Sequence, residues 1–348
     1  MHHRFAICCF FALRALASDV VRLDSPDGKV QLRLLLQADA GLGYAVAFQT
    51  KSVIEASPLG IVVDGVNLAA GVQVGKTQRY RVNETYPWHG VHATAVNRAN
   101  GVRMAVTHQK TGTKYTVEGR AYNDGIAFRF LVPGADGKSR VPDEATGFRL
   151  PAGSRVWYHD FEGHYEGTYT SKSVQEVAAG EWAAPPLTFR LPGGSGYASI
   201  TEGALRRYSG LGLQADGANG FRARLGHAHP VSYPFRLRYK EEVERVSQPA
   251  AVSGAITTPW RIVMVGPDLN TLVNCDIVHN VAPPPDPKLF PKGIRTDWIQ
   301  PGRAVWRYLD GGDGTLAGIK EFSRLAGELG FQYQVVEGFW RKWSESEL

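Results

Sequence analysis

Two histidines and two glutamates lie close together in the stretch HDFEGHYEGTY. They are His159, His164, Glu162 and Glu166. Imidazole and carboxylate groups at this spacing could share general acid-base work, since both can exchange protons near neutral pH. A loop in which these side chains only pack and hydrogen-bond is the alternative interpretation. The stretch is therefore a candidate site and also a candidate structural loop.

Two further patterns could hold a metal ion. His227 and His229 are two residues apart, so on a strand they would face the same way. No third ligand accompanies them, and ordinary surface or core histidines give the same pattern. Asp310 and Asp313 in DGGDGT resemble part of a calcium loop but lack its full ligand spacing, so they could equally cap the helix that follows.

Aromatic and acidic residues gather near the end of the sequence. Trp306, Trp340 and Trp343 could stack on the apolar faces of sugar rings, and Trp306 could instead pack in a core or at its rim. Glu337 follows the apolar run FQYQVV, at what would be the carboxyl end of a strand. In (β/α)₈ barrels the chemistry lies at that end, although a rim carboxylate without a direct role fits equally well.

Strands must position most of these residues. From about residue 20 to 261 the sequence alternates or runs apolar over strand lengths, with short turns rich in Gly, Asn and Asp. The clearest hairpin is KYTVEGRAYNDGIAFRFLV, in which Asn123-Asp124-Gly125 forms the turn. No period of blade length recurs, so the pattern predicts a large β-sandwich and not a propeller.

The last part of the sequence changes class. A Pro-rich stretch, APPPDPKLFPKG, is typical of a linker. After it come a strand in RAVWRYLDG, an amphipathic helix in GTLAGIKEFSRLAGELG and a second strand in FQYQVVEGF. Thr315 is the expected N-cap of the helix, and Gly330 its expected end. This order predicts a βαβ unit with a parallel strand pair, the opening of a (β/α)₈ barrel that is otherwise incomplete.

Composition and termini exclude some classes of protein. The formal net charge of +6 is modest and the arginines are scattered, which disfavours nucleic-acid binding. Residues 1–18 have a basic start, an apolar run and a small-x-small site, the form of a secretory signal peptide. The apolar run is too short to span a membrane. Removal of this leader would leave Cys275 as the single cysteine, and we expect a periplasmic or secreted protein without a membrane segment in its mature form.

Six stretches, in this order, resemble glycoside hydrolase family 97, the bacterial α-glucosidase and α-galactosidase group. They are SPLGI, YNDGIAFRF, ITEGALRRYSGLGL, TPWRIVMVG, WIQPGRAVWRY and LGFQYQVVEGFW. The resemblance implies a mainly β fold with a signal peptide at 1–18, a β-super-sandwich at 19–285, and a linker with the incomplete start of a (β/α)₈ barrel at 286–348. One position departs from the family pattern, because Glu337 stands where the family has Asp before Gly-Trp.

The resemblance also implies a chemistry. Family members hydrolyse terminal α-glucosidic or α-galactosidic bonds of oligosaccharides with the help of calcium, using carboxylates on later barrel strands. We therefore expect the catalytic residues to lie beyond Leu348 and this chain to be inactive alone. The motif TEGAL maps Glu202 onto a calcium ligand of the family, and Glu337, Trp306 and Trp340 become candidate substrate contacts. Calcium needs six to eight oxygen ligands, so Glu202 alone would leave the site incomplete.

Two alternatives to a glycosidase follow from the same sequence. The first is a carbohydrate-binding sandwich without catalytic activity. The second is a mutarotase-like sugar epimerase, which is also a super-sandwich and would use a His/Glu pair such as the one around His164.

Overall fold

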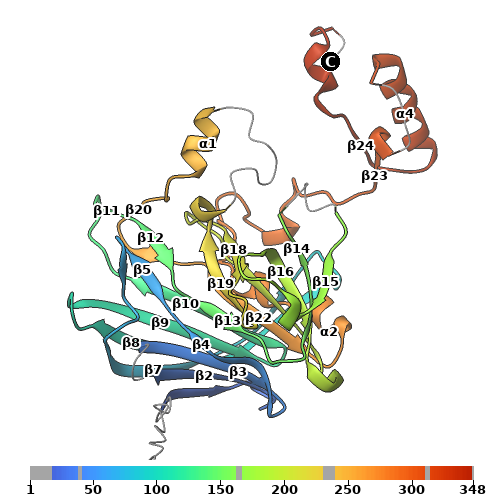
Figure 1. Cartoon of the computed structure of the whole chain (residues 1–348). Coiled ribbons are helices and arrows are strands. Elements are labelled where there is room, and N and C mark those ends of the chain that lie inside the picture. Colours follow the sequence, from blue (N-terminus) through green and yellow to red (C-terminus); the bar gives the residue numbers. More distant parts are fainter. Residues whose placement is uncertain (1–17, 38–40, 162–166, 230–239, 310–313, 347–348) are drawn as a thin grey trace, which may run out of the picture. The chain divides into compact units, whose positions relative to one another are not determined.

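The computed structural model describes residues 18–37, 41–161, 167–229, 240–309 and 314–346. The chain forms two compact units, Met1–Pro283 and Pro284–Leu348, called here the sandwich unit and the tail unit (Figure 1). Each is described by itself. Residues 1–17 of the proposed leader lie outside the described residues, and its last residue, Ser18, is the first of a strand. Within the described residues, no helix is long and apolar enough to cross a membrane.

The sandwich unit is built almost entirely from strands, as its alternating sequence predicts. Most of them belong to one continuous sheet of 17 strands. Its strands are β1 (Ser18–Asp24), β2 (Val30–Gln37), β3 (Gly41–Phe48), β4 (Lys51–Pro58), β7 (Val72–Pro87), β8 (Thr94–His108), β9 (Thr113–Tyr122), β10 (Gly125–Val132), β13 (Gly147–Arg149), β14 (Arg155–His159), β15 (Thr170–Ser173), β16 (Trp182–Arg190), β17 (Tyr197–Gly203), β18 (Leu211–Ala215), β19 (Gly220–Leu225), β21 (Ile256–Thr257) and β22 (Trp260–Gly266).

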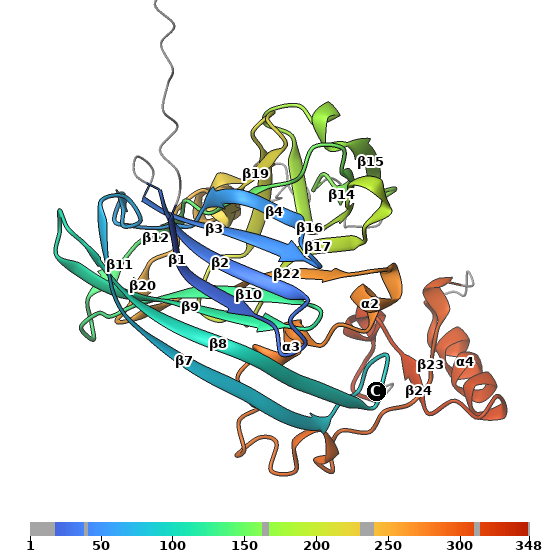
Figure 2. The same cartoon turned by 90° about the horizontal axis from the view of Figure 1, so that it is seen from below.

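This sheet curves round until it nearly closes on itself (Figures 1 and 2). Its hydrogen-bonded path runs β1-β2-β3-β4-β13-β19-β18-β16-β17-β22-β10-β9-β8-β7, and all the pairs are antiparallel. The path begins at β1 and ends at β7, and these two strands do not pair with each other. We call the gap between them the seam.

Small pieces complete the sandwich unit. Two short sheets are formed by β11 (Ser139–Arg140) with β20 (Val252–Ser253), and by β12 (Pro142–Glu144), β5 (Ile61–Val63) and β6 (Val66–Asn67). The helical pieces are α1 (Lys240–Val246), α2 (Leu269–Val273), α3 (Ile277–Asn280) and three 3-10 turns at Val174–Glu176, Pro192–Gly194 and Gly226–Ala228. The sequence predicted strands from about residue 20 to 261, so the helix α1 is an addition.

The main core fills the inside of the curved sheet. The predicted hairpin contributes to it, with β9 and β10 joined by Asn123 and Asp124 and with Phe130 opposite Val117. Gly125, the first residue of β10, has a φ of +155°, and a Cβ there would lie 2.4 Å from the carbonyl oxygen of Val263. The turn therefore depends on a glycine at that position, as the hairpin sequence indicated.

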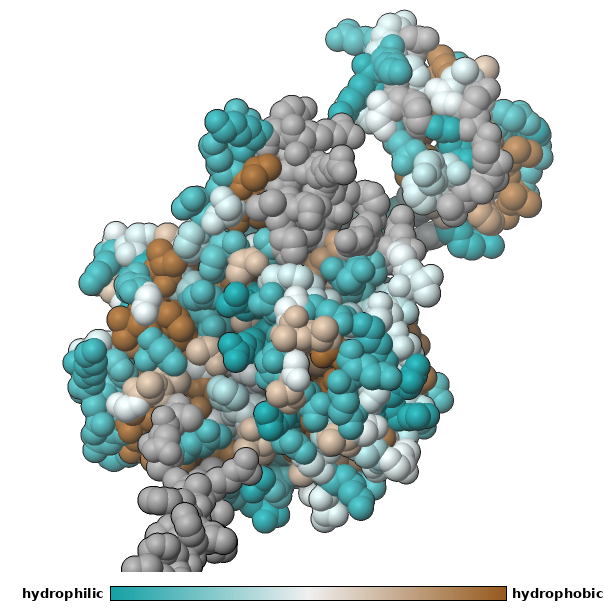
Figure 3. Space-filling view, viewed as in Figure 1, coloured by the Kyte–Doolittle hydropathy of each residue, from teal (hydrophilic) through white to brown (hydrophobic). Residues whose placement is uncertain are grey.

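A second, smaller core lies on the other face of the sheet. There α3 packs its Ile277 against Ala99, Ala127 and Trp260. Polar contacts fix the same helix, because Asn280 donates from Nδ2 to the carbonyl oxygen of Val96 at 2.8 Å. On the surface of the sandwich unit seen in Figure 3, hydrophilic residues surround scattered hydrophobic ones, so the apolar side chains are largely internal.

The tail unit contains the predicted parallel pair. β23 (Ala304–Trp306) and β24 (Tyr333–Val335) pair in parallel, and α4 (Leu316–Glu328) connects them. Three 3-10 turns, at Gly293–Arg295, Arg307–Leu309 and Gly338–Lys342, complete it. The Thr315 hydroxyl caps α4 by accepting from the N–H of Gly318 at 3.1 Å, and Gly330 ends it with a φ of +69°.

Both strands of the tail unit are shorter than predicted. The sequence indicated strands over most of RAVWRYLDG and FQYQVVEGF, but only three residues of each pair. A strand is extended by the partners that satisfy its backbone groups, and each of these two has one partner among the described residues. The chain beyond each strand therefore turns into a 3-10 segment.

Candidate functional site

Glu202 lies near the end of β17, and its position in the sheet brings it to an arginine. In the antiparallel pair of β17 with β22, Glu202 is directly opposite Arg261. Directly opposed residues share a face, so the two side chains meet on the inner side of the sheet.

Arg261 joins two glutamates into a buried ionic cluster. Its Nη1 donates to Oε2 of Glu202 at 2.5 Å, and its Nε donates to Oε2 of Glu144 at 3.0 Å. A further hydrogen bond runs from Nη2 to Oε1 of Glu144, which makes that pair bidentate. The side chains of Arg261 and Glu144 are each 1% exposed, whereas that of Glu202 is 15% exposed. Glu202 is therefore the member of the cluster that reaches solvent.

Charge compensation keeps this arginine ionised. Burial alone would lower the pKa of Arg261, but the charge and hydrogen bonds of Glu144 and the charge of Glu202 outweigh it and raise the pKa above its usual value. The opposite oxygen of Glu202, Oε1, accepts from the N–H of Leu211 at 3.0 Å. Both oxygens of Glu202 are thus oriented by the sandwich unit itself.

The segment after Glu202 has an unusual backbone. Ala204 and Arg207 have φ values of +57° and +51°, a region that residues with a Cβ rarely adopt. Next to them the hydroxyl of Tyr208 is buried and has no hydrogen-bond partner among the described residues. Burial raises the pKa of Tyr208, and the nearby charge of Glu144 adds to this effect. Strained backbone and an unsatisfied hydroxyl are features that binding sites often show.

The tail unit carries the other predicted residues at one end of its parallel pair. Trp306 ends β23 and lies opposite Val335, and Glu337 follows β24 two residues later. Trp306 is 38% exposed and stacks on Tyr308 with ring centroids 5.2 Å apart, so it lies at a rim and not in a core. Trp340, in the following 3-10 turn, is 46% exposed. The structure thus brings Trp306 and Glu337 to the same strand ends, and their contact with substrate stays a prediction.

Comparison with known proteins identifies the family. The model of the family described as "Glycosyl-hydrolase 97 N-terminal" matches residues 23–284, which is more than half of the chain. The chain belongs to glycoside hydrolase family 97. The resemblance seen in the sequence is confirmed, and so is the mainly β sandwich fold that it implied.

Relatives of this family 97 chain include named enzymes. It is 30% identical over 320 residues to the "Probable retaining alpha-galactosidase" of Streptomyces bingchenggensis, covering 89% of this chain and 45% of the relative. It is 25% identical over 370 residues to the "Retaining alpha-galactosidase" of Bacteroides thetaiotaomicron, covering 96% of this chain and 52% of the relative. The chain therefore spans about half the length of these curated relatives.

Solved structures share the fold. A family 97 enzyme of Pseudoalteromonas sp. strain K8, solved in complex with panose, superposes with a TM-score of 0.75 at 24% identity and covers 91% of this chain and 47% of the other. A β-arabinopyranosidase gives a TM-score of 0.75 at 21% identity, covering 91% of this chain and 50% of the other. At these identities the likeness shows the fold alone.

Calcium is the cofactor that the resemblance implied, and the described residues do not complete a site for it. They contain no group of three or more His, Cys, Asp or Glu side chains that could hold a metal ion. Calcium takes six to eight oxygen ligands. Glu202 offers one carboxylate, and Arg261 places a positive charge directly against it. Its role as a calcium ligand stays a prediction that requires further oxygen donors.

The predicted histidine sites separate in the family 97 fold. His227 lies in a 3-10 turn and not on a strand, so the strand geometry that would turn it the same way as His229 is not formed. Its Nε2 lies 3.4 Å from the Asp143 carboxylate, whereas His229 packs against Trp182 with centroids 5.3 Å apart. His159 is buried, and its Nδ1 accepts from the N–H of Phe161. His164, Glu162 and Glu166 lie outside the described residues, as do Asp310 and Asp313.

The sequence did not indicate Arg261, Glu144 and Tyr208 as members of the Glu202 site. Arg261 and Glu144 are 59 and 58 residues from Glu202, and each lies in an ordinary strand pattern. One signal was available, because Arg261 interrupts the otherwise apolar run WRIVMVG. An arginine in a central strand must find a partner, since an unpaired buried charge is prohibitively costly.

Proposed function

We propose that this chain is the sandwich domain and first βαβ unit of a retaining α-galactosidase of family 97, which removes terminal α-galactosyl groups from oligosaccharides. The observation that carries the proposal is the 30% identity to a probable retaining α-galactosidase across 89% of the chain. The second curated relative has the same named activity. These names favour galactose over glucose, a choice that the sequence had left open.

Each unit would contribute its own residues to the enzyme. The sandwich unit supplies a solvent-reaching carboxylate, Glu202, held by Arg261 and by the N–H of Leu211. The tail unit supplies Glu337 and Trp306 at the carboxyl ends of two parallel strands, the end at which barrel enzymes bind substrate. In a retaining glycosidase two carboxyl groups act as acid and nucleophile about 5 Å apart. We propose that this pair lies outside the 348 residues.

The test uses the natural gene product. Antibodies against the sandwich unit would isolate the protein from its own host, and hydrolysis of aryl α-galactoside and aryl α-glucoside would be compared. We expect at least about a tenfold preference for the galactoside, which corresponds to about 1.4 kcal/mol of transition-state binding. NMR of the first product should show α-galactose. A preference for the glucoside, or β-galactose as first product, would contradict the proposal.

The 348-residue chain provides a second test. With calcium and aryl α-galactoside we expect no turnover above buffer from the recombinant chain. Its calcium affinity, titrated by calorimetry, should be no tighter than about 1 mM, the weak end for protein sites, because Glu202 is the one carboxylate predicted to contact the ion. Turnover by the chain that Glu202→Gln or Glu337→Gln abolishes would show that the catalytic groups are present after all.

A further inference from the structure

The seam between β1 and β7 is closed by side chains and not by a strand ladder. β1 pairs with β2, and β7 with β8, and neither has a strand on its outer edge among the described residues. Arg79 donates from Nη2 to the carbonyl oxygen of Arg22 at 2.8 Å, and Asn100 donates from Nδ2 to that of Asp24 at 2.8 Å. These bonds occupy backbone acceptors of β1 that an added strand would need.

The inner face of β7 and β8 changes character at the seam. In the C-terminal half of β8, Val102, Met104 and Val106 point into the main core. N-terminal to Val102, the buried side of β8 is the opposite face, where Ala99 packs in the second core. The inner face of this N-terminal part of β8 is therefore exposed to solvent, and the residues on it are polar. Directly opposed pairs on this face are Arg81 with Asn100 and Asn83 with Arg98.

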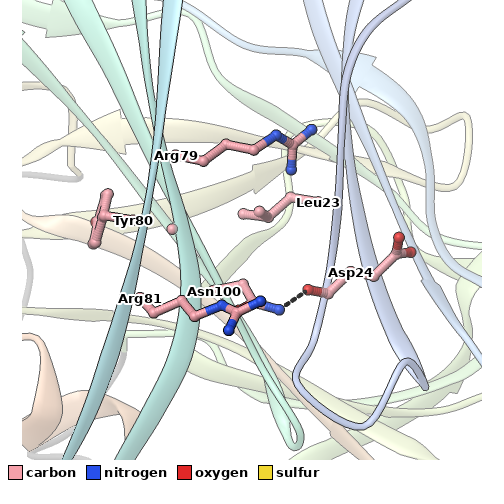
Figure 4. Close-up of a pocket in the computed structure, with 7 residues that line it drawn as sticks. Leu23, Asp24, Arg79, Tyr80, Arg81 and Asn100 are labelled. Atoms are coloured by element: carbon pink, nitrogen blue, oxygen red, sulfur yellow. Dashed lines mark hydrogen bonds between the residues drawn. The ribbon is translucent and has the colours of Figure 1, made fainter.

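This polar face is hollowed. A cavity of about 530 Å³ lies between β1 and β7, and an adjoining one of about 310 Å³ continues along β7 and β8. Arg81 and Asn100 line both, so the two form one groove, which we call the seam groove. Figure 4 shows Arg79 and Arg81 extending from β7 across the first cavity toward β1.

The arginines of the seam groove carry more positive charge than the acidic residue in its lining can neutralise. Three arginines line it, Arg79, Arg81 and Arg98. The acidic residue in its lining, Asp24, is already engaged by Arg22 at 3.2 Å and by Gln31 at 2.9 Å. Arg98 donates to the side-chain oxygen of Asn83 at 3.0 Å.

Arg81 is the available cation of the groove. It makes no hydrogen bond or ion pair with any described residue, and its side chain lies where the two cavities meet. Guanidinium groups bind carboxylate and sulfate oxygens through two parallel N–H donors, and neighbouring arginines repel each other until an anion is present.

Tyr80 is the aromatic residue among the described residues that line the groove, and it does not present its ring to it (Figure 4). Tyr80 points away from it (Figure 4), with its ring against Gly101, where a Cβ would lie 2.3 Å from a ring carbon. Its hydroxyl donates to Glu118 at 2.8 Å on the far side of the sheet. A neutral sugar would therefore lack the stacking platform that usually binds it, whereas an anion would find donors.

We propose that the seam groove binds a saccharide that carries carboxylate or sulfate groups. That a saccharide carries the anion rests on the proposed function, whereas recognition of the anion rests on the groove alone. Arg81 would contact the anionic group, with Arg79 or Arg98 and the side chain of Asn100 beside it. A galactose-containing polymer with carboxylate or sulfate groups on a branch or a neighbouring sugar would bind here through those groups. This binding would keep the protein on its substrate.

The experiment titrates the 348-residue chain, observed by calorimetry and by NMR, with trigalacturonate, a sulfated galactan tetrasaccharide and neutral galactotriose. We expect one or both anionic sugars to bind and the neutral one not to bind. Arg81→Ala should weaken this binding at least tenfold, and the double change Arg81→Ala with Arg98→Ala should abolish it. Arg190→Ala is the matched control, because Arg190 is also an exposed strand arginine but lies on β16, and it should leave binding unchanged. Thermal unfolding of each variant would check that it folds.

Three results would overturn the proposal. They are equal binding of galactotriose, unchanged binding in Arg81→Ala, and equally tight binding of polyglutamate or single-stranded DNA, which would indicate a general polyanion surface. None of these measurements involves hydrolysis. A wrong glycosidase assignment and a wrong assignment of the groove would therefore be told apart.

Discussion

The two units of this chain are built from equally regular elements but bury them very differently. In the sandwich unit, side chains as large as Trp260, Tyr44 and Phe128 are almost fully buried. In the tail unit, Ile319 and Ala326 are the buried hydrophobic residues among those described. Among the residues that the structure describes, nine of the eighteen exposed large hydrophobic ones fall in Pro284–Leu348, which is less than a fifth of the chain.

The difference shows that a regular sequence pattern can form helices and strands without giving them a packed core. The apolar stripe of α4 and its caps are those expected of a stable helix, yet Leu325 and Leu329 on that stripe are 37% and 64% exposed. Isolated helices of this length are marginal, and tertiary packing normally supplies most of their stability. The tail unit has a parallel strand pair joined by a helix, but its described residues form little buried core.

Truncation of one large hydrophobic residue in each unit should give the largest contrast. Phe128→Ala should lower the free energy of unfolding by about 3–5 kcal/mol, because it opens a cavity in the main core. Leu329→Ala, at the exposed C-cap of α4, should change it by less than about 0.5 kcal/mol. Urea unfolding followed by fluorescence measures both. Similar losses in the two variants would mean that the tail unit is packed as well as the sandwich.

The ionic cluster around Glu202 should be the most sensitive polar feature of the sandwich unit. Arg261→Met would leave Glu144 and Glu202 without their cation and should cost about 3 kcal/mol of unfolding free energy. Arg190→Met, at an exposed strand position, serves as the control and should cost less than about 0.5 kcal/mol. A loss in Arg261→Met no greater than the control would contradict the geometry of the cluster.

The attachment of α3 to the β7–β8 hairpin should have an intermediate effect. Asp276 accepts from the N–H of Val96 at 2.7 Å and contacts His92 and His279 at 2.7 and 2.9 Å. Asp276→Ala would leave the part-buried N–H of Val96 and both imidazoles without this partner, at a cost of about 2 kcal/mol. Thermal unfolding of the variant checks this, and an unchanged midpoint would show that α3 is held by its apolar contacts alone.

The smallest effect concerns pH. Burial alone would raise the pKa of Glu181, but hydrogen bonds from Lys172 and Tyr158 outweigh it and lower the pKa to about 2. A carboxyl with a depressed folded-state pKa stabilises the fold above its unfolded pKa, and this contribution is lost as the pH falls toward 2. Because the side chain is 29% exposed, we expect about 1 kcal/mol between pH 5 and pH 2.

The control for this pH effect lies in the tail unit. Glu181→Gln should flatten the acid branch of the stability profile, measured by urea unfolding at each pH. Hydrogen bonding to Arg324 also holds the pKa of Glu321 below its usual value, but that pair is fully exposed on α4. Glu321→Gln should leave the profile unchanged. If Glu181→Gln and Glu321→Gln flattened the acid branch equally, the two carboxylates would contribute equally to stability, and this contrast between the units would be wrong.

Local structure was predictable from the sequence where neighbouring residues decide it. The β9–β10 hairpin, the Thr315 cap and the end of α4 at Gly330 all depend on residues close in sequence. The parallel pair of β23 and β24 was predictable in kind but not in extent. Its length depends on partners that the local sequence does not specify.

Contacts between distant segments were not predictable in the same way. Glu202 was selected through a family motif, whereas its partners Arg261 and Glu144 come from strands that the sheet topology brings together. The seam groove depends on the same topology, because it exists only where the first and last strands of the path face each other. Charge and polarity at Arg81 and Arg98 are visible in the sequence, but their common face is not.

Hydrogen exchange read by mass spectrometry on the intact chain tests the contrast between the two units most directly. The account predicts that backbone amides of β8, β9 and β10 stay protected over hours, while those of α4 and β24 exchange almost at once, because few buried contacts oppose their opening. Protection of α4 and β24 equal to that of the β9–β10 hairpin would contradict it.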